Sequence, residues 1–323
     1  MDAIAREIRD SDDFLILSHV DPDGDALGSQ SALTLALRKM GKKAAAAVNV
    51  PVPKRYRFLP FAGSCLVTEA PPPHRVCITL DVGDLRRLRE DARREEYGRI
   101  LNIDHHVSNT LFGDVNWVDP EACAAGEMVW GLLKTLGIEP DRDILDSIYA
   151  SILADTGRFQ YSNTTPRVFH LAAELAEAGA DIHGVCRKIF SSESEAALRV
   201  LRAGLGNLKT HEGGRIGSVT LSWKEFREAG AAEDDTDNLI NFVRKVETVE
   251  VALYLRERSD GVFKMSLRSR NGVDVSKIAL SFGGGGHPYA AGALLEGPLE
   301  KALKKALDAC RKAIREKGRQ FEI

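Results

Sequence analysis

The sequence predicts a two-domain α/β protein, with an N-terminal domain built on a parallel sheet and a smaller α+β domain after it. Three short, apolar and largely β-branched runs are typical of strands buried on both faces: 14–17, 76–80 and 100–103. Helical patterns lie between these runs, so the order is that of βαβ units. Beyond residue 206 the pattern becomes strand-rich, which predicts a second domain there.

Several segments of the N-terminal half have helical patterns. Residues 1–13 are charged and helical in spacing, and residues 26–40 form a helical run that ends at Gly41. Residues 144–153 are apolar at helical spacing. The charged run 86–94 mixes both signs at helical spacing, which favours a solvated helix face.

The C-terminal half combines strands with a terminal helix. Strands are predicted at 215–223, 249–257 and 262–268. An amphipathic helix is predicted at 301–317, and its inward face consists of Leu303, Leu307, Cys310 and Ile314. We place domain one at 1–190, a linker at 191–206 and domain two at 207–323, and we expect the active site in the cleft between the domains.

Composition limits the classes of function. The chain is 44% hydrophobic, but no apolar stretch approaches the roughly 20 residues of a membrane span, and no secretory signal pattern opens it. We therefore expect a cytoplasmic protein without a membrane partner. The formal charge of −3 argues against a general grip on long duplex nucleic acid and favours short phosphate-bearing ligands. The five cysteines are scattered, which is typical of buried thiols.

Side chains of the metal-ligand type stand where the predicted elements end. His19, Asp81 and Asp104 follow the three strands, and Asp155 follows the helical run 144–153. Ligands collect beyond the carboxyl ends of the strands in open parallel sheets, so these side chains are expected to meet. Carboxylates combined with imidazoles suit a divalent ion of the manganese type.

Each of these residues taken alone has a structural alternative. An Asp after a strand commonly caps a helix, and Asp25 illustrates this because a helical run begins at residue 26. The pair His105-His106 alone would fit a hydrogen-bonded structural role. Four separate segments that all end in ligand-type residues are what favours a metal site.

The glycine run 283–286 does not have the context of a dinucleotide-binding loop. It follows a helical pattern at 275–282 and precedes a strand-like segment at 290–295. A C-cap turn needs only one glycine. Accessible backbone N–H groups, together with Arg268 and His287, would instead suit a phosphate.

These segments resemble a known family. The residues His19-x-Asp21-x-Asp23-x-Asp25, Asp81, Asp104-His105-His106 and Asp155 resemble motifs one to four of the DHH phosphoesterases. Ser266-Leu-Arg268-Ser269 and Gly283-Gly-Gly-Gly-His287-Pro-Tyr-Ala-Ala-Gly292 resemble the signatures of the DHH-associated C-terminal domain. Their order and spacing are similar to the branch of bacterial oligoribonucleases, the nanoRNases, that also act on 3′,5′-adenosine bisphosphate (pAp). One departure is the segment 122–127, where relatives often place Ser or Thr ahead of the Glu.

The resemblance implies a set of roles. Two divalent ions, with Mn²⁺ favoured and Mg²⁺ or Co²⁺ as alternatives, would be held by His19, Asp23, Asp25, Asp81, His105 and Asp155, with Asp81 shared. His106 would donate to the phosphate oxygens or the leaving group, and Asp104 would orient a histidine. A terminal-nucleotide pocket would use Arg268, Ser269, Gly284, Gly285, Gly286 and His287.

The resemblance implies a metal-dependent phosphodiesterase that degrades short single-stranded RNA of about two to five residues to mononucleotides and removes the 3′-phosphate of pAp. The alternative is a phosphodiesterase for cyclic di-AMP or for the linear dinucleotides pApA and pGpG. An inorganic pyrophosphatase and a catalytically silent nucleotide sensor are the more distant alternatives. A homodimer is left open.

Overall fold

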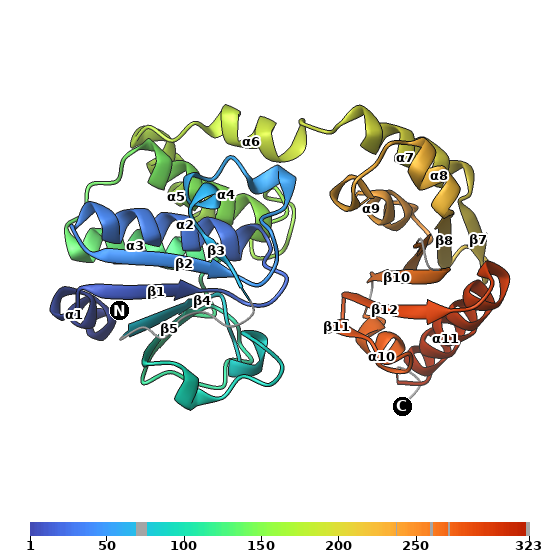
Figure 1. Cartoon of the computed structure of the whole chain (residues 1–323), viewed down its shortest axis with the longest axis horizontal. Helices are drawn as coiled ribbons and strands as arrows, with labels where there is room; N and C mark the ends of the chain where they lie inside the picture. The colour runs from blue at the N-terminus through green and yellow to red at the C-terminus, as the bar shows by residue number, and fades with distance from the viewer. Residues whose placement is uncertain (69–75, 237, 259–260, 271, 321–323) are drawn as a thin grey trace. The chain divides into compact units, whose positions relative to one another are not determined.

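The computed structural model describes residues 1–68, 76–236, 238–258, 261–270 and 272–320, without the side chains of His287 and of residues 318–320. The chain divides into two compact units, Met1–Ser192 and Glu193–Ile323 (Figure 1). This division falls within the segment 191–206 that was expected to be a linker. Most of that segment is helix α7 (Glu195–Gly206), which Ser194 caps by accepting a hydrogen bond from Ala197 N at 3.0 Å.

The first unit is built on a six-stranded parallel sheet. Its strands are β1 (Asp13–Leu17), β2 (Lys43–Val48), β3 (Leu66–Val67), β4 (Val76–Leu80), β5 (Arg99–Asp104) and β6 (Val115–Val118). Their order is β3-β2-β1-β4-β5-β6. The chain therefore runs outward from β1 in one direction and then restarts at β4 on the other side. Ligand sites of open sheets lie at such a reversal, and here it falls between β1 and β4.

Helices cover one face of this sheet, and short turns cover the other. The helices are α1 (Asp2–Asp10), α2 (Gly24–Lys39), α3 (Ala125–Leu136), α4 (Arg142–Asp155), α5 (Pro166–Glu177) and α6 (Ile182–Phe190). In Figure 1, α2 and α3 run beside the sheet. Their apolar side chains join Ile16, Ile78 and Leu101 in the main core. The opposite face of the sheet packs against Leu85, Leu88 and other residues of irregular segments.

The short 3₁₀ turns of the first unit are η1 (Lys54–Tyr56), η2 (Pro60–Gly63), η3 (Leu85–Arg87) and η4 (Arg94–Glu96). The predicted helix at 86–94 was wrong, because the chain there forms only η3 and η4. Arg89 pairs with both Asp91 and Glu96 at 2.5 Å. Ion pairs at these spacings hold an irregular loop rather than a helix face.

Two glycines allow α2 and α3 to approach α4 closely. A Cβ at Gly28 would lie 2.6 Å from Ser147 O, and one at Gly126 would lie 2.1 Å from Ser151 Oγ. Because backbones can pack this tightly only without side chains, the N-terminal ends of both helices are fixed against α4. This packing sets the position of Asp25, in the first turn of α2.

The second unit is a mixed sheet with helices on both faces. Its strands are β7 (Lys209–His211), β8 (Ile216–Leu221), β9 (Val251–Glu257), β10 (Val262–Ser269), β11 (Gly285–His287) and β12 (Ala290–Glu296), in the order β11-β12-β10-β9-β8-β7. Only the β8–β9 pair is parallel. Its remaining elements are α7, α8 (Trp223–Glu228), η5 (Glu233–Thr236), α9 (Leu239–Arg244), α10 (Val275–Leu280) and α11 (Leu299–Gln320). The predicted α+β character is confirmed.

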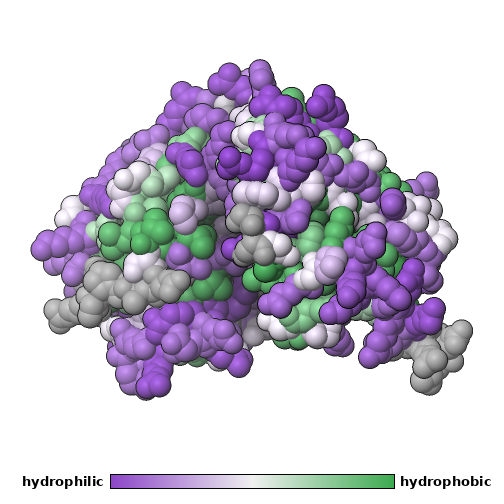
Figure 2. Space-filling view, turned by 45° about the vertical axis from the view of Figure 1, so that its right-hand side comes forward, coloured by the Kyte–Doolittle hydropathy of each residue, from purple (hydrophilic) through white to green (hydrophobic). Residues whose placement is uncertain are grey.

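The core of the second unit has two layers. Leu253, Leu255 and Met265 face α10 and α11, while Ala252 and Tyr254 face α7, α8 and α9. The surface in Figure 2 is mostly hydrophilic, with hydrophobic residues gathered in patches. Among the described residues, no helix combines the length and the apolar character that a membrane crossing requires.

Candidate functional site

The structure brings the predicted ligand side chains of the first unit together. His19 lies in the loop after β1, Asp81 directly follows β4, and His105 directly follows β5. Asp155 is the last residue of α4, as expected. The potential ligand atoms form three groups within 4.8 Å: His19, Asp23 and Asp81; Asp25, His105 and Asp155; and Asp81, His105 and His106. The reversal between β1 and β4 thus places these side chains in one cluster.

Asp81 lies at the centre of this cluster. Its Oδ2 is 3.5 Å from His19 Nε2, and its Oδ1 is 3.4 Å from His105 Nε2. The side chain is only 4% exposed, and within the described part of the chain Oδ1 has no hydrogen-bond partner. The backbone of Asp81 is in the left-handed region, at φ 60°. A strained backbone and an unsatisfied buried oxygen both favour a ligand that the carboxylate binds.

The two histidines present the same ring nitrogen to the carboxylates. His19 Nδ1 donates to Val20 O at 2.8 Å, and His105 Nδ1 donates to Ala122 O at 3.1 Å. The carbonyls therefore fix the tautomer that leaves each Nε2 lone pair directed at the cluster. This is the arrangement that a histidine needs in order to bind a metal ion.

The charges of the cluster are unbalanced. Burial lowers the pKa of His19, but the nearby carboxylates of Asp81 and Asp23 outweigh it and raise that pKa to about 9. His105 behaves alike, with a pKa raised to about 10. Burial raises the pKa of Asp25 well above its usual range, and that of Asp155 to about 6. The raised pKa values of the histidines and of the carboxyl groups share one cause, an excess of carboxylates withdrawn from water, and such a cluster fits the binding of divalent cations.

Asp25 and Asp23 have distinct local roles. Asp23, not Asp25, is the N-cap of α2, because its Oδ1 accepts hydrogen bonds from Asp25 N and Ala26 N. The helix thus begins at Gly24, earlier than the predicted residue 26. The buried Asp25 carboxylate accepts from Ala125 N at 2.8 Å and from Ser151 Oγ at 2.6 Å. The helix-capping role that was considered for Asp25 is therefore carried out by Asp23.

Asp104 and Asn109 hold His106. Asp104 is fully buried, and its Oδ1 accepts from His106 Nδ1 at 2.7 Å. Its Oδ2 accepts from Asn109 Nδ2 at 2.5 Å. The side chain of His106 is 43% exposed, so the imidazole has a fixed orientation and remains accessible to a ligand. The histidine that Asp104 orients is thus His106, which follows the predicted ligand His105 in the sequence.

Three residues of this site were not predicted from the sequence. Asn163, in the loop after α4, donates to Asp155 Oδ2 at 3.2 Å, and Ser151 donates to Asp25. Asn109 was also missed. In a single sequence an Asn in a loop or a Ser in a helix gives no signal that separates it from ordinary capping and surface residues.

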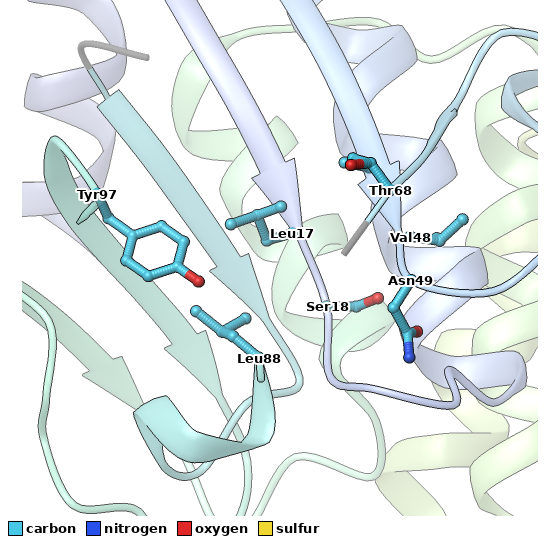
Figure 3. A pocket seen from close by; sticks show the side chains of 8 residues that line it. Leu17, Ser18, Val48, Asn49, Thr68, Leu88 and Tyr97 are labelled. Atoms are coloured by element: carbon cyan, nitrogen blue, oxygen red, sulfur yellow. The ribbon is translucent and has the colours of Figure 1, made fainter. Parts of the chain in front are cut away.

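A small pocket adjoins this cluster without containing any of its predicted ligands. It is lined by Leu17, Ser18, Ala47, Val48, Asn49, Thr68, Leu88 and Tyr97 (Figure 3). Asn49 Oδ1 accepts a hydrogen bond from Asp21 N at 3.2 Å. One residue that lines the pocket is therefore hydrogen-bonded to the loop that carries His19 and Asp23.

The predicted nucleotide-binding residues of the second unit lie on β10 and on or just before β11, the two strands that flank β12. Arg268 on β10 is paired with Ala290 on β12, and Ala290 is paired with His287 on β11. Arg268 is half-buried. Ser269 is on the opposite face of β10, since side chains alternate along a strand, and its Oγ donates to Pro288 O at 3.2 Å. The side chain of His287 lies outside the described residues.

At three of the four positions 283–286, the backbone conformation or the packing explains why the residue is glycine. Gly283 lies in the turn after α10 with a left-handed backbone at φ 73°, and a Cβ at Gly284 or Gly286 would lie within 2.5 Å of the β12 backbone. The N–H groups of Gly283 and Gly284 donate to Leu280 O and Ala279 O. The expected cradle of free N–H groups is therefore reduced, and only Gly285 among the four has neither a packing contact at its Cβ position nor a positive φ.

Known proteins match both units of the chain. The family model for the DHH family, N-terminal domain, matches residues 13–154, and that for the DHHA1 domain matches residues 217–316. The bifunctional oligoribonuclease and PAP phosphatase NrnA of Thermus thermophilus is 36% identical over 94% of this chain and 90% of that protein. The protein of the same name from Bacillus subtilis is 28% identical over 90% and 91%.

A solved structure, that of an exopolyphosphatase-related protein from Bacteroides fragilis, matches with a TM-score of 0.87 and 27% identity, over 96% of this chain and 95% of that chain. The two domain matches and the 36% identical relative agree with the clustered motif residues of the first unit. Residues 13–154 and 217–316 thus show that the chain belongs to the DHH family of phosphoesterases, with a DHHA1 domain in its second unit.

Proposed function

We propose that this protein hydrolyses short single-stranded RNA of about two to five residues to mononucleotides and also removes the 3′-phosphate of pAp. The observation that carries the proposal is the buried Asp81 carboxylate between His19 and His105, in a chain 36% identical to a bifunctional oligoribonuclease and PAP phosphatase. The formal charge of −3 favours short substrates over long duplexes. We place this activity in the cytoplasm.

Phosphoesterases of this family are metal-dependent, and the residues of the first unit are chemically suited to divalent cations. We assign one ion to His19, Asp23 and Asp81 and a second to Asp25, His105 and Asp155, with Asp81 shared. Mixed carboxylate and imidazole ligands suit Mn²⁺. Such ions would supply Lewis-acid chemistry at the scissile phosphodiester.

Residues outside the ligand set orient the substrate and deliver a proton. His106 Nδ1 donates a hydrogen bond to Asp104, so Nε2 is the nitrogen that can face a phosphate oxygen or the leaving-group oxygen. In the second unit, the planar guanidinium of Arg268 suits a terminal phosphate. Gly285, Gly286 and His287 on β11, which is separated from β10 by β12, complete the proposed nucleotide pocket.

The proposal is tested by comparing turnover in Mn²⁺ on a two-residue RNA, pAp, linear pApA, cyclic di-AMP and pyrophosphate. We expect the dinucleotide and pAp to have the highest kcat/KM. Preference for cyclic di-AMP would assign the same metal centre to a different phosphodiester, and preference for pyrophosphate would assign it to a phosphoanhydride. Absence of turnover on all five substrates would contradict the proposal.

A further inference from the structure

The segment 122–126, which follows β6 and ends in the first turn of α3, contacts several of the proposed metal ligands through its backbone. Ala122 O accepts from His105 Nδ1 at 3.1 Å. Ala125 N donates to Asp25 Oδ2 at 2.8 Å, and Gly126 N donates to Asp25 Oδ1 at 3.3 Å. One short stretch of backbone therefore orients an imidazole and a carboxylate that belong to the same ligand group.

Asn163 connects the third member of this group to the same segment. Its Nδ2 donates to Asp155 Oδ2 at 3.2 Å, to Asp155 O at 3.1 Å and to Cys123 O at 3.1 Å. All three partners are acceptors, so the amide has one favourable orientation: a flip would direct Oδ1 at three oxygens. Asn163 therefore holds the Asp155 carboxylate against the segment 122–126.

The segment is itself fixed from both sides. Glu127 is 7% exposed; its Oε2 accepts from Cys123 N at 2.8 Å, and its Oε1 pairs with Arg167 of α5. Ser151 of α4 accepts from Gly126 N at 3.0 Å and donates to Asp25 Oδ1 at 2.6 Å. These contacts join α3, α4 and α5 around the segment, so its backbone groups have little freedom to move.

The other ligand group is supported by different contacts. His19 Nδ1 donates to Val20 O, and the Asp23 carboxylate accepts from the first turn of α2. Among the hydrogen bonds of the described residues, neither side chain contacts segment 122–126 or Asn163. The shared carboxylate of Asp81 is the only ligand that belongs to both proposed ions.

We propose that segment 122–126 and Asn163 position the ligands of only one ion, the one assigned to Asp25, His105 and Asp155 together with the shared Asp81. Asn163 is a positioning residue, since it acts on the ion through Asp155. The two metal sites can therefore be weakened separately, even though they share Asp81. This inference rests on the proposed function in requiring two ions, but it concerns their binding and not the identity of the substrate.

The test is a Mn²⁺ titration of the full-length protein followed by electron paramagnetic resonance and calorimetry. Wild type should bind two ions and show the signal of a spin-coupled pair. Asn163→Ala should retain one ion with unchanged affinity and bind the second about 10–100-fold more weakly, the usual effect of losing a contact that orients a metal ligand. The signal should then become that of an isolated ion at intermediate Mn²⁺.

Two further variants separate positioning from folding. Ser151→Ala removes a hydroxyl contact to Asp25 from another helix and should weaken the same site. Asn116→Ala is the matched control, because Asn116 Nδ2 also donates to backbone carbonyls in this unit, those of Leu111 and Gly113, away from the ligands. It should bind both ions like wild type. Melting temperatures of all variants would be measured first.

Several outcomes would overturn the inference. If Asn163→Ala and Ser151→Ala, folded as judged by melting, bound both ions with wild-type affinity, the segment would not position the second site. If they weakened both sites equally, the support would not be selective. A wild type that bound two ions but hydrolysed none of the five substrates would refute the proposed function and leave this inference standing.

Discussion

His106 Nδ1 donates a hydrogen bond to the fully buried Asp104 at 2.7 Å, and this contact fixes the orientation of an otherwise accessible imidazole. We expect Asp104→Asn to lower kcat on a dinucleotide by about 10–100-fold, because an amide can donate to Nδ1 and reverse the tautomer. The Mn²⁺ affinity should change little. Steady-state kinetics and a Mn²⁺ titration measure both, with the exposed Asp91→Asn as the control. A variant with wild-type kcat would remove Asp104 from the mechanism.

Asp81 is the ligand that both ions would share. Asp81→Asn keeps the shape of the side chain and tolerates φ 60°, but it removes the negative charge. We expect a folded protein whose hydrolysis falls roughly 10³-fold or more, since metal ions contribute several kcal/mol at a phosphoryl group. Circular dichroism and turnover on every substrate would be compared. Near-wild-type activity would exclude the two-metal assignment.

Removal of the metal ions should also abolish hydrolysis, but reversibly. Chelation should abolish turnover, and added Mn²⁺ should restore it better than Ca²⁺, whose longer bonds and preference for oxygen ligands suit histidine poorly. Mn²⁺ should also raise the melting temperature of the chelated protein, because an ion that binds only the folded state stabilises it. Equal restoration by Ca²⁺ would contradict the proposed ligands.

The strand ends of the site could be predicted because buried parallel strands are continuous apolar runs, and ligands follow them directly. Strand β2 was not predicted, because the four consecutive alanines between Lys43 and Val48 have little strand preference. The segment is a strand because it pairs with β1. Asn163 and Ser151 could not be assigned either. Their roles depend on which groups the fold places beside them, and the sequence around each residue does not indicate those neighbours.

Glu250 should make the second unit sensitive to acid. Hydrogen bonding from Arg215 at 2.6 Å, followed by that from Lys317 at 3.1 Å, lowers the pKa of Glu250 below its ordinary value of 4.5. A lowered folded-state pKa means that the stabilisation is present above 4.5 and is lost as the pH falls through the folded pKa.

We therefore expect Glu250→Gln to reduce the free energy of unfolding by about 1 kcal/mol at neutral pH, as is usual for partly exposed ion pairs, and by less in acid. Thermal unfolding of both proteins across the pH range measures the difference. Glu228→Gln, at a 66% exposed side chain, is the control. A pH-independent difference would show that Glu250 stabilises through packing.

Arg268 should determine how the enzyme responds to substrate length. Loss of a charge-assisted phosphate contact, worth roughly 1.5–3 kcal/mol, should lower kcat/KM of Arg268→Ala on dinucleotides about ten- to hundredfold. A small chromogenic phosphodiester without a terminal phosphate should be affected much less. Lys264→Ala is the matched control, because Lys264 lies on the same face of β10, four residues away, and is exposed. It should leave both substrates unchanged.

The same comparison on RNAs of increasing length tests why short substrates are favoured. If Arg268 and the β11 backbone hold one terminal nucleotide, binding energy should stop increasing after about five residues, since further gain would need a basic or aromatic track along the strand. Aromatic residues make up only 7% of the chain, and its net charge is negative. Equal losses in Arg268→Ala on the dinucleotide and the small ester would show that Arg268 supports the fold instead. A wild type with higher kcat/KM on a long strand than on a dinucleotide would contradict the terminal-nucleotide pocket, because a pocket for one end cannot reward added length.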